Sequence, residues 1–179
     1  MKIKHYLGIN SKIALNHIVC QLISAVIGLF AFSVFYEKMW GKVLAGVFYS
    51  GFYIVRMYSA AYKIGEKDTK VYSEHKPYVL KGLACSVLTV LISLIAILLY
   101  KVGVNSQGYG TKILCINFFK LWNFNFTPFM NVGYGVAPVW YLVVLACPVA
   151  CVFFGYLAGM KRYELGHKFF TKLVYKDKK

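Results

Sequence analysis

The sequence predicts an all-α, polytopic integral membrane protein: a bundle of four transmembrane helices with an aromatic segment before the last one. Three observations predict this fold class. First, 59% of the 179 residues are hydrophobic and only 15% are charged, with a mean hydropathy of +0.58, which is too apolar for an ordinary soluble domain. Second, the charges lie in short stretches between long apolar runs. Third, these runs reach the roughly 20 residues that a helix needs to cross a bilayer.

Four charge-poor intervals give the predicted spans within a single membrane domain, 1–179. They cover residues 13–36, 43–62, 82–100 and 136–158. Arg56 is the only charged residue inside any of them. The first apolar run is longer than the 7–15 residues typical of a signal peptide, so we expect the first helix to be retained.

The interval between the second and third spans, 62–81, mixes lysines with three of the six acids. We expect a solvated hairpin there. Gly65 is placed to end the second helix, because glycine readily adopts the left-handed conformation of a helix C-cap. Glu66, Asp68 and His75 match no metal-ligand spacing. The sequence therefore predicts no metal site and no cofactor.

An aromatic segment precedes the fourth span. Residues 113–124 are predicted to form a helix that lies in the outer interface, or dips into the membrane as a short re-entrant piece. Asn117, Lys120 and Asn123 recur every three residues, which predicts one polar stripe. Either the aromatic rings anchor the chain at the headgroup level, or they form a lid over a ligand site that opens outward.

The basic residues predict the orientation. With four spans, the N-terminus, the 62–81 interval and the C-terminus share one side, which carries 15 of the 21 Lys and Arg residues. Lys and Arg accumulate on the cytoplasmic side of spans, so both termini are expected in the cytoplasm. The plain charge bias and the Lys-rich composition favour the inner (cytoplasmic) membrane of a bacterium. The excess of basic residues behind the net charge of +15 is then explained by the orientation of the chain in the membrane. No nucleic-acid partner is expected.

The tail, residues 161–179, is strongly basic. A basic cluster next to a span is attracted to anionic lipid headgroups by about 1 kcal/mol per Lys or Arg. We therefore expect the tail to lie against the bilayer on the cytoplasmic side.

Polar residues inside the spans form the candidate binding site. Arg56 precedes the predicted cytoplasmic end of its span by six residues, or about 9 Å, so it either snorkels to lipid phosphates or faces the bundle. In the second case, a polar pocket that is open to the cytoplasm and suited to an anionic group contains Arg56, His17, Gln21, Asn16, Ser59 and Tyr62. The alternative is that these residues only join helices by hydrogen bonds.

Close helix packing is predicted separately, from small residues four positions apart. These pairs are Ser24 and Gly28, Gly46 and Ser50, and Gly155 and Gly159. The five cysteines are expected to be small packing residues.

Three functional classes remain. The favoured one is a non-enzymatic accessory or scaffold subunit of a membrane complex, with a membrane-protein partner or a second copy of the chain. The alternative is a small transporter or permease component that uses the polar pocket. An enzyme is not expected: a lipid-modifying reaction with His17 as base lacks an evident nucleophile, carboxylate pair or metal site.

Overall fold

The computed structural model describes residues 2–31, 38–70, 77–130 and 135–161, and the regular elements in these ranges are all helices. In chain order they are α1 (Lys2–Ala31), α2 (Met39–Asp68), α3 (Lys81–Ala84), α4 (Val87–Asn105), α5 (Tyr109–Trp122), the 3-10 helix η1 (Phe124–Phe129) and α6 (Pro138–Met160).

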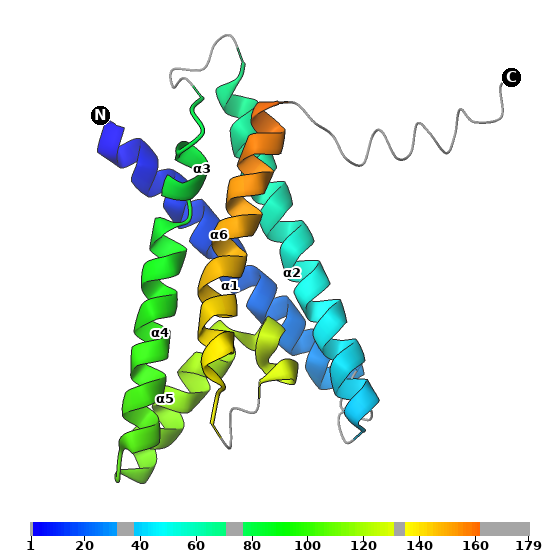
Figure 1. Ribbon diagram of the computed structural model, residues 1–179, viewed down its shortest axis with the longest axis vertical. Coiled ribbons are helices and arrows are strands. Elements are labelled where there is room, and N and C mark those ends of the chain that lie inside the picture. Colours follow the sequence, from blue (N-terminus) through cyan, green and yellow to red (C-terminus); the bar gives the residue numbers. More distant parts are fainter. Residues whose placement is uncertain (1, 32–37, 71–76, 131–134, 162–179) are drawn as a thin grey trace, which may run out of the picture.

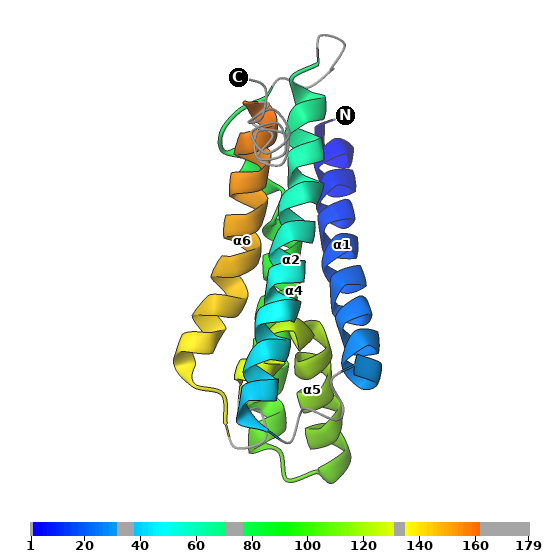
Figure 2. The ribbon, with the colours of Figure 1, turned by 90° about the vertical axis from the view of Figure 1, so that its right-hand side faces the viewer.

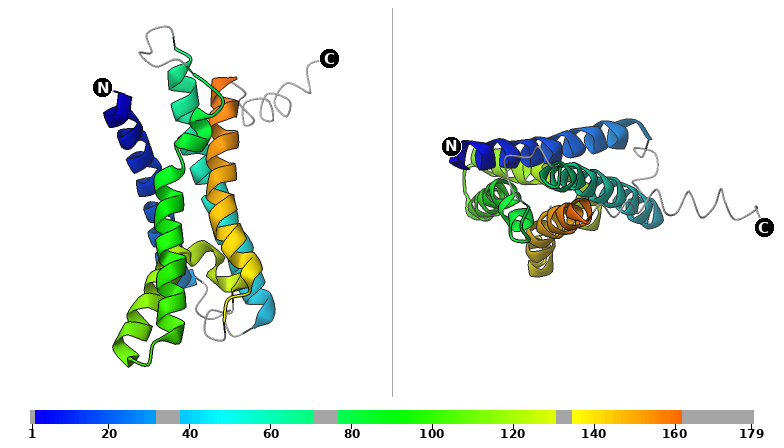
Figure 3. Two further views of the ribbon diagram at one scale, coloured as in Figure 1. Left: turned by 60° about the vertical axis from the view of Figure 1, so that its left-hand side comes forward. Right: turned by 90° about the horizontal axis from the view of Figure 1, so that it is seen from above.

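Four long helices, α1, α2, α4 and α6, run along the bundle in alternating directions (Figure 1). Their contacts join α1 to α2, α2 to α6, α6 to α4 and α4 back to α1, an arrangement that the view from above also shows (Figure 3). The first residues of α1 and the last residues of α6 lie at the same end, which we call the N-terminal end. Helices α5 and η1 lie toward the opposite end, which we call the hairpin end because the chain turns back there between α4 and α5 (Figure 2).

Three of the helices are long and apolar enough to cross a membrane: Tyr6–Gly28 within α1, α4, and α6. This finding supports a multi-helix membrane protein. Helix α2 is as long as α1 but less apolar, because it carries Lys42, Arg56, Lys63, Glu66, Lys67 and Asp68. A membrane crossing by α2, and with it the four-span bundle, therefore stays a prediction.

The most extensive helix contact joins α2 and α6, and glycines make it possible. A Cβ atom at Gly155 would collide with the carbonyl oxygen of Tyr58, and one at Gly159 with that of Tyr62. From the other side, a Cβ at Gly65 would collide with the carbonyl oxygen of Tyr156. The expected helix end at Gly65 is therefore wrong: α2 continues to Asp68, and Gly65 serves the close approach of two backbones instead.

In each of the other two predicted small-residue pairs, the glycine lies close to an aromatic ring of η1. An added Cβ at Gly28 would lie 3.1 Å from the ring of Phe124, and one at Gly46 would collide with the ring of Phe129. These glycines therefore allow η1 to sit against α1 and α2.

Helices α5 and η1 fold back along the bundle from the hairpin end (Figure 2). Helix α5 packs along α4 and begins at Tyr109, before the expected start at residue 113. Asn117 and Lys120 are exposed as the polar stripe predicts, but Asn123 is buried. That part of the prediction is wrong because Asn123 satisfies its own helix end: its Nδ2 donates to the carbonyl oxygen of Phe119 at 3.0 Å.

The interval 62–81 differs from the expected solvated hairpin. Its first residues belong to α2, and its last residue, Lys81, begins the short helix α3, which packs on α6. Asp68 and Lys81 are 6% and 1% exposed. Glu66 does stay half-exposed, while His75 lies outside the described residues.

Candidate functional site

The predicted pocket residues do not gather in one place. Asn16, Arg56 and Ser59 line a groove between α1 and α2, whereas His17 and Gln21 are buried in the bundle core. Tyr62 is partly buried on α2 and lines neither region. Neighbours such as Asn16 and His17 separate because successive residues of an α-helix point about 100° apart.

His17 joins three elements through its ring. Its Nδ1 lies 2.9 Å from the hydroxyl of Tyr53 on α2, and its Nε2 lies 3.0 Å from the carbonyl oxygen of Trp122 on α5. A carbonyl oxygen only accepts, so the network assigns the proton to Nε2, and Nδ1 accepts from Tyr53. The imidazole also packs against the ring of Trp122, with centroids 4.3 Å apart. With 1% of the residue exposed, both ring nitrogens are committed to neighbouring helices.

Gln21 holds the start of η1. Its Oε1 accepts from the backbone N–H of Asn125 at 3.0 Å and from Asn125 Nδ2 at 2.8 Å. These two donors determine the orientation of the Gln21 amide and leave its Nε2 3.2 Å from His17 Nε2. Because His17 Nε2 donates to Trp122, this last contact is a close approach of two donors.

The network extends to α4 through Trp122, whose indole Nε1 donates to Ser93 Oγ at 2.9 Å. Side chains of α1, α2, α4, α5 and η1 are thus joined around His17, which lies halfway between Tyr6 and Gly28 of the apolar α1 segment. Hydrogen bonds between helices in a membrane interior are worth about 0.6–2 kcal/mol each. For His17 and Gln21, the geometry matches the helix-joining alternative.

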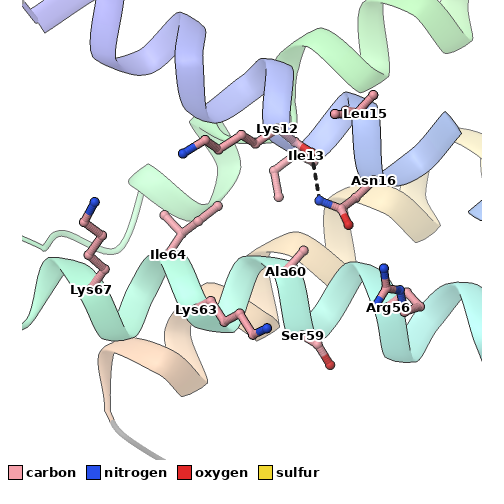
Figure 4. Close-up of a pocket in the computed structure, with 10 residues that line it drawn as sticks. All are labelled: Lys12, Ile13, Leu15, Asn16, Arg56, Ser59, Ala60, Lys63, Ile64 and Lys67. Carbon is pink, nitrogen blue, oxygen red and sulfur yellow. Dashed lines mark hydrogen bonds between the residues drawn. The ribbon is translucent and has the colours of Figure 1, made fainter. Parts of the chain in front are cut away.

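The groove between α1 and α2 has a cavity volume of about 380 Å³. Its lining is shown in Figure 4 and consists of Lys12, Ile13, Leu15, Asn16, Arg56, Ser59, Ala60, Lys63, Ile64 and Lys67. Four of these side chains are cationic, and none is acidic. Arg56 and Asn16 lie toward one end of the groove, while Lys12 and Lys67 lie toward the other (Figure 4).

Helical periodicity explains this lining. On α2, Arg56, Lys63 and Lys67 are separated by seven and four residues, which places them on one face. On α1, Lys12 and Asn16 are four apart, and Asn16 Nδ2 donates to the carbonyl oxygen of Lys12 at 2.9 Å. The sequence reading missed Lys63 and Lys67 because it ended the helix at residue 62. Extending the Arg56 face by about three turns finds both.

A buried ion pair was also missed. Lys81 Nζ lies 2.6 Å from Asp68 Oδ2, and the Tyr156 hydroxyl donates to the same oxygen at 2.9 Å. The side chains of Lys81 and Asp68 are 1% and 5% exposed. This cluster joins α2, α3 and α6 at the N-terminal end of the bundle. The sequence alone does not distinguish Asp68 and Lys81 from the solvent-exposed charges of a loop.

The described residues contain no group of three or more His, Cys, Asp or Glu side chains that could hold a metal ion. The five cysteines are free thiols, all buried except the partly exposed Cys147. Comparison of the chain with protein-family models, with curated proteins and with solved structures gives no match.

Proposed function

We propose that this chain is a non-enzymatic accessory or scaffold subunit of a membrane complex. The observation that carries the proposal is the His17 network, because the polar side chains at the middle of the bundle join its helices to one another. Both nitrogens of the His17 imidazole contact neighbouring helices, through Tyr53 and Trp122. Such an interior favours a stable framework that presents its outer surface and tail to a partner.

The proposed framework crosses the inner membrane of a bacterium four times, with α1, α2, α4 and α6, and has both termini in the cytoplasm. The alternating directions of the four helices support it. So do the positions of Lys12 in the first half of α1 and of Lys63 and Lys67 near the end of α2, which are the parts of these helices toward the N-terminal end. The bias of 15 of 21 basic residues toward this side gives the same orientation. Helix α2 would then be held in the membrane by its neighbours as well as by lipid.

In this arrangement α5 and η1 form a re-entrant hairpin that enters from the outer side. Backbone that is not helical is tolerated at membrane depth only where protein or water satisfies its polar groups. Gln21 provides such a partner for the backbone N–H of Asn125, and His17 provides one for the carbonyl oxygen of Trp122. The aromatic rings of η1 accordingly contribute to the core more than to a surface belt.

Affinity purification tests the accessory role. The tagged chain, extracted from its own membranes in a mild detergent, is expected to bring a second membrane protein in a fixed ratio, and deletion of residues 162–179 is expected to lose it. Lys112→Gln, an exposed cation at the opposite end, is the matched control and should retain the companion. Recovery of the chain alone, or an unchanged companion after the deletion, contradicts the proposal.

The second candidate is a small transporter or permease component, which the cationic groove favours. Transport requires that Arg56→Ala abolish uptake or efflux of a solute while the amount of inserted protein is unchanged. If Arg56→Ala changes neither, or lowers only the amount of protein, the accessory role is favoured.

A further inference from the structure

The groove between α1 and α2 differs chemically from the rest of the bundle. Cations line it from both helices, and no acidic side chain among its lining residues neutralises them. The nearby acid Glu66 is paired instead with Lys70, at 3.8 Å. Because uncompensated cations in a membrane protein turn toward an anion or water, this groove is arranged for a negatively charged ligand.

The lining also contains apolar side chains between the cations. Ile13, Ala60 and Ile64 occupy the middle of the groove in Figure 4, between Arg56 at one end and Lys12 and Lys67 at the other. A fully hydrated anion gains nothing from such a surface. An amphiphile, in contrast, places its charged group on the cations and its hydrocarbon on the apolar residues.

The cations span more length than one small anion covers. Arg56 and Lys67 are eleven residues apart on one helix, or about 16 Å along its axis. The cavity volume of about 380 Å³ also lies in the range of about 300–1,000 Å³ typical of small-molecule sites. The length between the cations and the volume of the cavity both fit a molecule with polar groups at two depths in the membrane.

We propose that this groove binds one anionic phospholipid of the adjacent leaflet. The phosphate contacts Lys12 and Lys67 at the N-terminal end, and the ester oxygens lie deeper, near Arg56. The acyl chains continue along the exposed apolar surface of α1, where Leu15 and Leu22 are 60% and 50% exposed. Guanidinium and ammonium groups both suit phosphate and ester oxygens, since each supplies several N–H donors.

Lipid binding to the full chain in a neutral detergent tests this site. In native mass spectrometry we expect phosphatidylglycerol to remain bound and the zwitterionic phosphatidylcholine to be lost. The double variant Lys12→Gln/Arg56→Gln is expected to weaken phosphatidylglycerol binding about 30-fold, the factor for two cations of about 1 kcal/mol each. The matched control, Lys38→Gln/Lys42→Gln, removes two exposed cations from the opposite end of α2 and should leave binding within about twofold.

Four outcomes overturn the proposal. Equal binding of the two lipids, or equal losses in the double variant and the control, means that the groove does not select an anionic lipid. Inorganic phosphate that displaces phosphatidylglycerol at equal concentration assigns the groove to a soluble anion. Loss of a companion protein without loss of lipid in Lys12→Gln/Arg56→Gln assigns it to an acidic protein segment. Circular dichroism of each variant verifies the helical fold, and Lys63→Gln, a third lining cation, repeats the test if the double variant does not fold.

Discussion

Replacing Lys81 with Met is expected to lower the free energy of unfolding by about 3–5 kcal/mol, the usual cost of leaving one member of a buried ion pair without its partner. Asp68 would remain 6% exposed, with only the Tyr156 hydroxyl left as a polar partner among the contacts described above. Reversible unfolding of the purified chain in detergent measures this loss. Asp68→Leu is also expected to lower the free energy of unfolding, because it leaves the Lys81 ammonium buried without its partner.

The chain contains a matched control for this experiment. Lys70 and Glu66 also form an ion pair, 3.8 Å apart, but their side chains are 41% and 40% exposed. Exposed pairs contribute about 0–1 kcal/mol, so Lys70→Met should change stability little. The double variant Lys81→Met/Asp68→Leu should recover much of the loss, because neither charge then remains buried. Similar effects of Lys81→Met and Lys70→Met would contradict the burial described here.

Adding a single methyl group at Gly159 is expected to destabilise the contact between α2 and α6. Its Cβ would collide with the carbonyl oxygen of Tyr62, and backbone atoms, unlike the end of a side chain, move only with their helix. We expect Gly159→Ala to cost about 1–3 kcal/mol, as overpacking does in well-packed cores. Thermal unfolding in detergent measures the change.

Gly51 is the control for this substitution. It also lies within a long helix, α2, but nothing approaches within 4 Å of the Cβ that alanine would add. Gly51→Ala should therefore be neutral or stabilising by up to about 1 kcal/mol, since alanine has the higher helix propensity. Opposite signs for the two glycines support the close approach of α2 and α6, and equal effects contradict it.

The helical class could be predicted from hydropathy because long apolar runs leave few alternatives. Three of the four expected spans overlap helices that are long and apolar enough to cross a membrane. The close approach at Gly155 and Gly159 was also predictable, since small residues four apart lie on one helix face. Each of these predictions depends on a pattern within a single segment of the sequence.

The candidate site could not be assembled in this way, because it depends on which helix faces meet. Asn16 and His17 are adjacent in sequence, yet one lines the groove and the other enters the core. The partner of Gln21 is Asn125, more than a hundred residues away. Asp68 and Lys81 resembled the solvated charges of a loop, and only the packing of α3 against α6 shows that they are buried.

Labelling the two ends of α2 tests whether this helix crosses the membrane as part of a four-span bundle. In a variant without the five native cysteines, Lys42→Cys and Lys67→Cys each place one exposed thiol near an end of α2. We predict that a membrane-impermeant maleimide labels Lys42→Cys in intact cells and labels Lys67→Cys only after permeabilisation. Labelling of both positions from the same side would contradict the four-span bundle.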